Sequence, residues 1–301
     1  MRSDGRGTVG TMSVRPAAVA GTWYPGTAGA LGREVDGYLD GADTGPAGDT
    51  AAIISPHAGI MFSGPVAAYA YKTASTGAYD VAVLIGPSHF AAFDGVALYP
   101  EGAFATPFGL VAIDSEVAAA VARTDIVRPL VSAHVREHSL EMQLPFLARV
   151  LPAVPIVPLL IGAQTRGTIE ALAAALVQSL RGRRALLVAS TDLSHYYDAA
   201  TAATLDGAVS TCISQFDTAA LLERFESYPE HDRGRSVGCG MGAAIAVMIA
   251  AHGLGAADAR VLRYGHSGEI SGDYAGVVGY LAAAFGNYGP ESDGHAESHA
   301  Q

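Results

Sequence analysis

Short runs of apolar and β-branched residues alternate along this chain with alanine-rich stretches, and this alternation limits its fold more than any other feature. Eight runs are predicted strands: 51–55, 81–86, 95–98, 110–113, 156–161, 185–190, 260–264 and 275–282. Eight stretches are predicted helices: 30–39, 66–73, 115–123, 140–150, 168–180, 201–215, 218–225 and 242–251. Strands that alternate with helices indicate an α/β fold. Because the strands are apolar throughout, we expect three layers, with helices on both faces of a mostly parallel central sheet.

The chain has 301 residues, of which half are apolar and 16% are charged, so it can bury a large core. No linker or internal repeat divides it, and we expect a single domain over residues 15–286. Residues 1–14 and 287–301 are mostly small and polar. We expect them to form a disordered leader and a disordered tail.

Charge and hydropathy argue against two classes of partner. The balance of 18 basic and 29 acidic residues gives a net charge of −11, which disfavours nucleic acid. The longest apolar run, 237–251, is interrupted by glycines and is shorter than the ~20 residues of a spanning helix, so we expect no membrane partner. With two cysteines and no apolar signal region near residue 1, we expect a cytoplasmic protein.

Polar residues with catalytic or metal-binding potential follow three of the predicted strands. His57, His89 and the pair of Asp192 and His195 each lie a few residues after a strand end. Ligands of open α/β sheets bind at the carboxyl ends of the strands. We therefore expect these side chains to converge on one crevice.

Cys239 lies in a glycine-rich segment just before a predicted apolar helix. The dipole and free N–H groups at a helix N-terminus stabilise a thiolate, which suits a nucleophile or a metal ligand. The alternative is a tight packing turn with an inert buried thiol. Cys212 lies within a predicted helix and is expected to be a small buried apolar residue.

A third cluster contains His134, Glu137, His138 and Glu141. The first three form the H-x-x-E-H pattern of inverted zinc peptidases, in which both histidines share one helix face. Alternatively, Glu137, His138 and Glu141 form a polar edge of the crevice, with Glu141 in the first turn of a helix.

Six blocks resemble the Memo family, whose bacterial and archaeal members are called AmmeMemoRadiSam system protein B. The blocks are AGTWYPG at 20–26, SPHAG at 55–59, GPSH at 86–89, EHSLEMQLPF at 137–146, STDLSHY at 190–196 and CGMG at 239–242. The resemblance implies a fold similar to the class III extradiol ring-cleaving dioxygenases, which use non-haem Fe(II). The chain departs from the family after PHAG, where tyrosine is common and Ile60, Met61, Phe62 and Ser63 stand here.

The resemblance also implies roles for individual residues. The implied metal ligands are His57, His89 and Cys239. The implied catalytic residues are His195, as the proton-transferring group, and Asp192. The expected substrate-binding residues are Trp23, Glu137, His138 and Glu141.

Fe(II) is the cofactor that this resemblance implies, with copper or zinc as alternatives because a cysteine replaces the usual carboxylate of the facial triad. The leading hypothesis is an iron-dependent oxidoreductase acting on a small, aromatic substrate. The aromatic residues expected near the strand ends are Trp23, Phe62, Phe90, Tyr196 and Tyr264. Two alternatives stay open: a non-catalytic accessory protein with radical SAM and AMMECR-type partners, and a zinc peptidase through His134 and His138.

Overall fold

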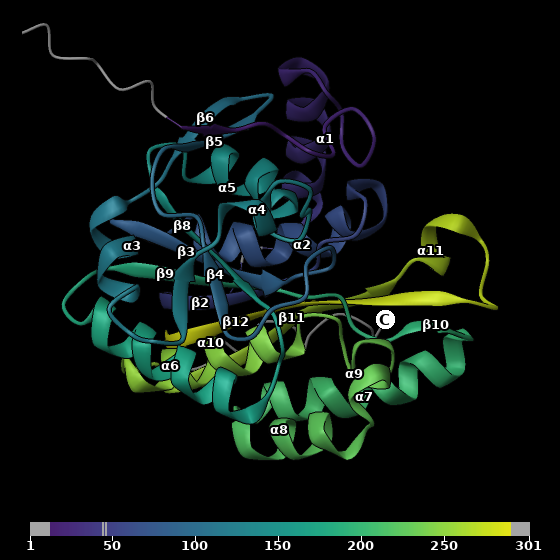
Figure 1. Cartoon of the computed structure of the whole chain (residues 1–301). Helices are drawn as coiled ribbons and strands as arrows, with labels where there is room; N and C mark the ends of the chain where they lie inside the picture. Colours follow the sequence, from purple (N-terminus) through teal and green to yellow (C-terminus); the bar gives the residue numbers. More distant parts are fainter. Residues whose placement is uncertain (1–12, 44, 46, 290–301) are drawn as a thin grey trace, which may run out of the picture.

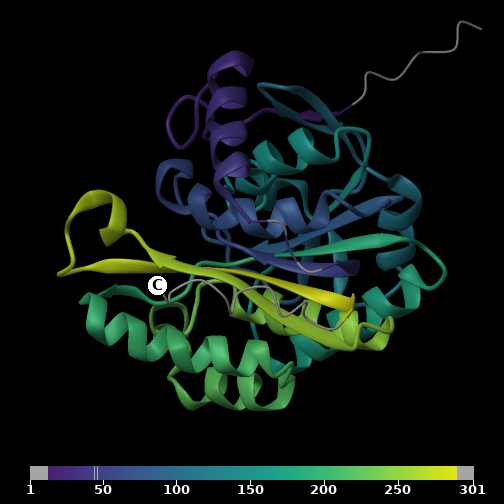
Figure 2. The same cartoon turned by 180° about the vertical axis from the view of Figure 1, so that it is seen from behind.

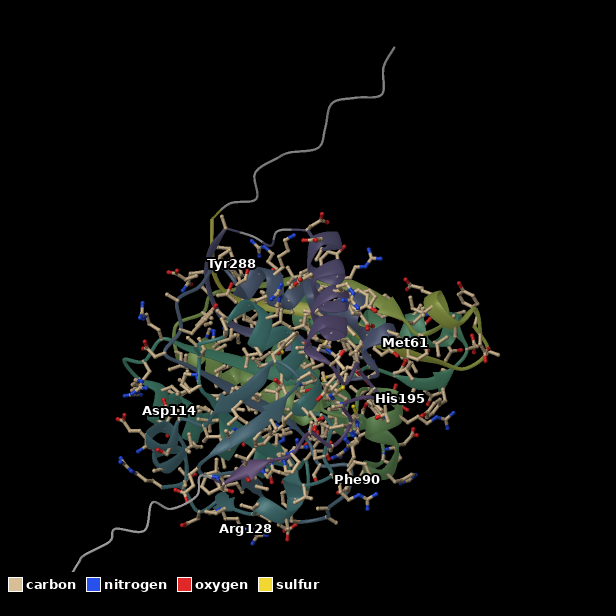
Figure 3. All side chains as sticks on the ribbon, turned by 90° about the horizontal axis from the view of Figure 1, so that it is seen from above. Met61, Phe90, Asp114, Arg128, His195 and Tyr288 are labelled. Atoms are coloured by element: carbon tan, nitrogen blue, oxygen red, sulfur yellow. The ribbon has the colours of Figure 1, made fainter. Side chains whose placement is uncertain are left out.

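A central β-sheet lies between two layers of helices in the computed structural model of the chain, which describes residues 13–43, 45 and 47–289 (Figures 1 and 2). The predicted leader and tail therefore fall outside the described residues, except for 13–14 and 287–289. The last strand runs to Tyr288, which is labelled in Figure 3, and thus ends two residues beyond the predicted domain end at residue 286.

The described strands are β1 (Val14–Arg15), β2 (Gly48–Ser55), β3 (Val81–Pro87), β4 (Val96–Leu98), β5 (Ala103–Thr106), β6 (Gly109–Ala112), β7 (Val127–Pro129), β8 (Ile156–Ile161), β9 (Ala185–Ser190), β10 (His195–Tyr197), β11 (Asp258–His266) and β12 (Val277–Tyr288). The α-helices are α1 (Ala28–Gly41), α2 (Ile60–Ala74), α3 (Ser115–Val121), α4 (Val131–His134), α5 (Leu144–Val150), α6 (Arg166–Leu180), α7 (Ala199–Ser214), α8 (Thr218–Ser227), α9 (Glu230–Ser236), α10 (Met241–Gly253) and α11 (Gly268–Ser271). A short 3-10 helix, η1 (Glu141–Gln143), precedes α5.

The large sheet has the strand order β10-β12-β2-β9-β3-β8-β4-β7, and β11 also pairs with β12. Its four inner strands, β2, β9, β3 and β8, are parallel. Antiparallel pairs extend the sheet on both sides, through β12 next to β2 and β4 next to β8. The α/β prediction is confirmed, and the inner strands are parallel as expected. The flanking strands make the whole sheet mixed.

Helices α1, α2 and α5 cover one face of this sheet, and α6, α7, α8 and α10 cover the other (Figures 1 and 2). Strands β3 and β8 are buried along their whole length, which explains why neither shows polar alternation. Helix α10 is rich in alanine and glycine and is almost completely buried. Small side chains let this helix approach the sheet closely.

Within the described residues, no single helix is both long and apolar enough to span a membrane. Helices α9 and α10 meet those criteria only together, as a pair bent by 78°.

Several short elements were absent from the sequence prediction. Strands β1 and β5 form a small separate sheet with β6, and β7 and β10 add to the large sheet. A strand of two to four residues carries no usable periodicity, because its conformation depends on distant pairing partners. In β10, Tyr196 has a φ of 61°, a backbone conformation uncommon for a non-glycine residue.

Candidate metal centre

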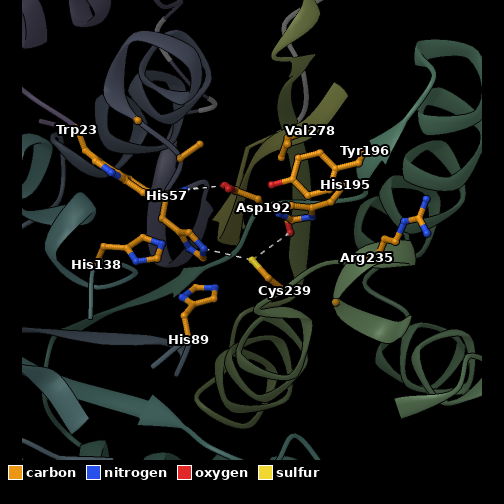
Figure 4. A pocket seen from close by; sticks show the side chains of 13 residues that line it. Trp23, His57, His89, His138, Asp192, His195, Tyr196, Arg235, Cys239 and Val278 are labelled. Carbon is orange, nitrogen blue, oxygen red and sulfur yellow. Dashed lines mark hydrogen bonds between the residues drawn. The ribbon is translucent and has the colours of Figure 1, made fainter. Parts of the chain in front are cut away.

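The carboxyl ends of β2, β9 and β3, which are neighbours in the sheet, open into a pocket of about 520 Å³ (Figure 4). The structure brings the histidines, acid and cysteine that follow these strands, or precede α10, into one place. The side chains of this kind that line the pocket are His57, His89, His138, Asp192, His195 and Cys239. Figure 4 shows Cys239 between the first three histidines on one side and Asp192 with His195 on the other.

The ligand atoms of His57, His89 and Cys239 all lie within 4.8 Å of one another. Cys239 Sγ and His57 Nε2 are 3.2 Å apart. Metal–ligand bonds of about 2.0–2.3 Å place two ligands of one ion up to about 4.6 Å apart. The 4.8 Å limit on this group is close to that separation, so the three side chains could share one ion after small adjustments. Asp192, His195 and Cys239 form a second, overlapping group with the same spacing limit.

The ring of His57 is oriented by a buried hydrogen-bond network. Ser190 Oγ donates to the Ser139 carbonyl at 2.6 Å and accepts from Gln143 Nε2 at 2.8 Å. The Gln143 amide is in turn fixed by Tyr71, whose hydroxyl donates to Gln143 Oε1 at 2.9 Å. Because the only Ser190 hydroxyl proton is committed, the 2.8 Å contact with His57 Nδ1 requires a proton on that nitrogen. The lone pair of His57 is therefore on Nε2, where it faces the Cys239 thiol at 3.2 Å and can bind a metal that displaces the thiol proton.

His89 is oriented by the buried carboxylate of Glu137. Glu137 Oε1 accepts from His89 Nδ1 at 2.9 Å, and Oε2 accepts from the His89 backbone N–H at 2.5 Å. The backbone N–H groups of His138 and Ser139 also donate to Oε1, each at 2.9 Å. Burial disfavours the charge, yet these hydrogen bonds, led by those from His89, lower the pKa of Glu137 to about 2. The arrangement is a carboxylate–histidine pair of the kind that supports metal sites.

The turn that carries Cys239 fits against the end of β9 only because glycines flank it. A Cβ atom on Gly240 would lie 2.2 Å from the Ser190 carbonyl oxygen, and one on Gly238 would lie 2.7 Å from the Asp192 carbonyl oxygen. Gly238 also has a φ of 153°. Both glycines are therefore needed for the close approach.

The charge state of the Cys239 thiol differs from the expectation based on its place before a helix. Burial, helped by the nearby Asp192 carboxyl, raises the pKa of the thiol. Helix α10 begins at Met241, two residues after Cys239, and its dipole does not offset the burial. A bound cation would reverse the balance, because a coordinating thiol loses its proton.

His195 and Asp192 line the opposite side of the pocket. His195 Nδ1 lies 2.7 Å from the Leu193 carbonyl and donates to it, which leaves Nε2 as the free nitrogen. Asp192 Oδ1 accepts from the His57 backbone N–H at 2.7 Å. Burial raises the pKa of Asp192, although the nearby His195 opposes that shift. A further acid, Asp206 of α7, is fully buried and accepts from the backbone N–H of Ser194 at 2.9 Å.

The two glutamates predicted to bind substrate do not line the pocket. Glu137 is engaged by His89, as described above. Glu141 forms a buried ion pair of 2.6 Å with Arg15 and accepts from the Tyr24 hydroxyl at 2.8 Å. It also accepts from the backbone N–H groups of residues 18 and 19, so its structural role is to hold the segment that carries Trp23.

The other two predicted substrate-binding residues, Trp23 and His138, do line the pocket. Their ring centroids are 4.3 Å apart, and His138 also stacks on His89 with centroids 4.6 Å apart. Among the five aromatic residues expected near the strand ends, Trp23 and Tyr196 line the pocket, whereas Phe62, Phe90 and Tyr264 do not.

The zinc-peptidase interpretation needs His134 and His138 on one helix, but the structure does not place them on the same helix. Helix α4 is a single turn that ends at His134, and His138 lies outside it. His134 is buried, with its Nε2 atom 3.2 Å from the Ala97 carbonyl oxygen, and it does not line the pocket. Burial lowers its pKa to about 4. The peptidase interpretation therefore lacks its shared helix face.

Three residues that shape the site were not singled out from the sequence: Gln143, Ser190 and Asp206. Gln143 and Ser190 fix the His57 ring, and Asp206 holds the chain next to His195. Asp206 had a detectable signal, because it is a lone acid in an alanine-rich helix. Gln143 and Ser190 look like ordinary polar residues beside apolar runs until the fold brings them together.

Comparisons with known proteins place the chain in a family. The model of the family described as Memo-like protein matches residues 15–284. A MEMO1 family protein of Methanopyrus kandleri is 35% identical over 285 residues, covering 90% of this chain and 98% of the relative. A MEMO1 family protein of Methanothermobacter thermautotrophicus is 36% identical over 278 residues, covering 89% of this chain and 98% of the relative.

Among solved structures, an uncharacterized protein of Escherichia coli K12 shares the fold, with a TM-score of 0.53 and 14% sequence identity. The match covers 79% of this chain and all of that chain. The resemblance seen in the six sequence blocks is thus confirmed over nearly the whole described domain, and the chain belongs to the Memo-like protein family.

Proposed function

We propose that the protein binds Fe(II) through His57, His89 and Cys239 and acts as a non-haem iron-dependent oxidoreductase related to the extradiol dioxygenases. The observation that carries the proposal is the convergence of three ligand atoms within 4.8 Å, with the Nδ1 atoms of both histidines held by fixed partners so that each Nε2 atom carries the lone pair. Orientation of this kind is typical of metal-binding histidines.

The donor set fits a first-row metal. When bound in a site with two histidines and a third protein ligand, Fe(II) supplies redox activity and open coordination positions for external ligands. The thiolate of Cys239 makes this set softer than the usual carboxylate triad, so copper and zinc are the competing occupants.

The chain itself supplies a proton acceptor on the opposite side of the pocket. Because the Nδ1 proton of His195 is donated to Leu193, its Nε2 atom can accept a proton from a substrate hydroxyl. Asp192 connects this side of the pocket to the metal-ligand side, because its Oδ1 atom accepts from the His57 backbone N–H at 2.7 Å. We assign His195 the proton transfer and Asp192 the positioning of the strand ends.

Metal analysis of protein purified without oxygen tests the metal assignment. We expect about one iron per chain in the wild type and at least a tenfold loss in His57→Ala and Cys239→Ser. Cys212→Ser is the matched control, because Cys212 is a buried thiol in α7 away from the pocket. Unchanged iron content in His57→Ala and Cys239→Ser would overturn the assigned ligand set.

Oxygen uptake with phenolic compounds tests the oxidoreductase part. We expect uptake by the iron-loaded wild type and its loss in His195→Gln with iron content retained. Tight metal binding without uptake would contradict this part and favour the accessory role beside a radical SAM protein.

A further inference from the structure

The pocket has a positively charged end that the metal-centre proposal does not use. Arg235, near the end of α9, lines the pocket together with Gly234. A Cβ atom on Gly234 would lie 3.7 Å from the Cα atom of Cys239, so this part of α9 packs directly against the cysteine turn. Figure 4 shows Arg235 on the far side of His195 and Tyr196 from the three clustered histidines.

The Arg235 guanidinium is held in place without a carboxylate partner among the described residues. It lies over the ring of Tyr197, 4.6 Å from the ring centroid. The Tyr197 hydroxyl is 2.9 Å from Ser236 Oγ, which itself donates to Asp232 Oδ2 at 2.8 Å. Asp232, one turn before Arg235, is thereby engaged by Ser236. The arginine is left charged, positioned and free to bind an anion.

Arg235 is also the one residue in the pocket lining with a permanent positive charge, because a guanidinium does not lose its proton. Asp192 is the one acid in that lining, and the chain carries a net charge of −11. Because the pocket lining has one permanent cation and the chain as a whole is acidic, a ligand group with a single negative charge suits this end of the pocket better than a group with two. A guanidinium binds a carboxylate through two parallel hydrogen bonds.

We propose that Arg235 recognises the carboxylate of a small aromatic acid, whose ring lies in the pocket between Trp23 and Tyr196. A volume of about 520 Å³ is in the range for a small-molecule pocket. The two aromatic side chains lie on opposite sides of it in Figure 4. The aromatic acid would be the substrate of the proposed oxidoreductase. Which end of this molecule reacts rests on that proposed function. Carboxylate binding itself does not require the metal.

A matched pair of probes isolates the charge. The acid 4-hydroxybenzoate and its neutral amide 4-hydroxybenzamide have nearly the same shape, and their dissociation constants are measured by calorimetry at pH 7. We expect the wild type to bind the acid about tenfold more tightly or better. Arg235→Gln should abolish this preference, and Arg235→Lys should restore part of it. Arg136→Gln is the control, because Arg136 lies over Phe90, 5.0 Å from the ring centroid, but does not line the pocket.

Each titration is performed on metal-free and on Fe(II)-loaded protein, with iron content measured separately. Failure to bind iron would contradict the proposed function, while the metal-free titrations would still test Arg235. Equal binding of acid and amide by the wild type, no binding of either, or an unchanged preference in Arg235→Gln would overturn the role of Arg235. Tighter Arg235-dependent binding of phenyl phosphate than of 4-hydroxybenzoate would overturn the carboxylate assignment.

Discussion

Replacement of Glu137 by glutamine is expected to weaken metal binding although the residue does not touch the pocket. Both carboxylate oxygens accept hydrogen bonds: Oε1 from His89 Nδ1 at 2.9 Å and Oε2 from the His89 backbone N–H at 2.5 Å. A glutamine has only one acceptor oxygen, and its NH₂ group would face one of these donors. The His89 ring would then lose either its fixed Nδ1–H orientation or the backbone contact that places it.

The expected loss follows from the support that such carboxylates give to metal-bound histidines. Removal of a partner of this kind costs about 10- to 100-fold in metal affinity, or about 1.4–2.7 kcal/mol. The change also affects stability, because the pKa of Glu137 is about 2 in the folded protein against an ordinary value of 4.5. This difference corresponds to about 3 kcal/mol of stability above pH 4.5, which is lost as the pH falls toward 2.

Fe(II) affinity is measured by anaerobic competition with a chromophoric chelator at pH 7, with the folded fraction followed by circular dichroism. Glu141→Gln is the matched control: Glu141 is equally buried and pairs with Arg15 at 2.6 Å but makes no contact with His89. We expect Glu141→Gln to lower stability while the folded protein keeps its iron affinity within about threefold. Wild-type affinity in Glu137→Gln, or an equal loss in both variants, would refute the reasoning.

Three further changes test the surroundings of the site. Ser190→Ala removes the acceptor 2.8 Å from His57 Nδ1 and should weaken iron binding by about tenfold, as measured by the same competition. Gly240→Ala places a Cβ atom 2.2 Å from the Ser190 carbonyl oxygen, so we expect Cys239 to be displaced, with loss of iron and a lower melting temperature. His134→Gln should leave metal content unchanged. Burial lowers the pKa of His134 from 6.5 to about 4. The free energy of unfolding of the wild type should therefore fall by about 3 kcal/mol as the pH is lowered from 6.5 to 4. Urea unfolding of the variant should show a smaller loss over the same pH range.

Among the strands, the inner ones, which are almost completely buried, could be predicted most accurately from the sequence. The predicted strands 156–161 and 185–190 coincide with β8 and β9, because inner strands of a covered sheet must be apolar throughout. The last strand was predicted over 275–282 but extends to Tyr288, because pairing with β2 and β11 continues beyond the apolar run. Such pairing has no local signal in the sequence.

The convergence of the candidate ligands could be predicted because it follows from topology. Strand β9 lies between β2 and β3, so residues just after these three strands must meet at one edge of the sheet. The roles of Glu137 and Glu141 could not be separated in this way. The two lie four residues apart in one block and are both buried, yet one orients His89 and the other binds Arg15. Only the three-dimensional arrangement distinguishes them.

Cys239 shows how these non-local effects bear on the chemistry of the site. The helix-terminus rule predicts a stabilised thiolate, but burial and Asp192 raise the pKa of the thiol. A neutral thiol gives little electrostatic attraction for a cation, so capture of the metal depends first on the two imidazole lone pairs. Those lone pairs are directed into the pocket by Ser190 and Glu137. If the proposed site binds a metal in this order, loss of either partner should impair the step that precedes deprotonation of Cys239, and residues outside the pocket would then control whether the thiolate forms.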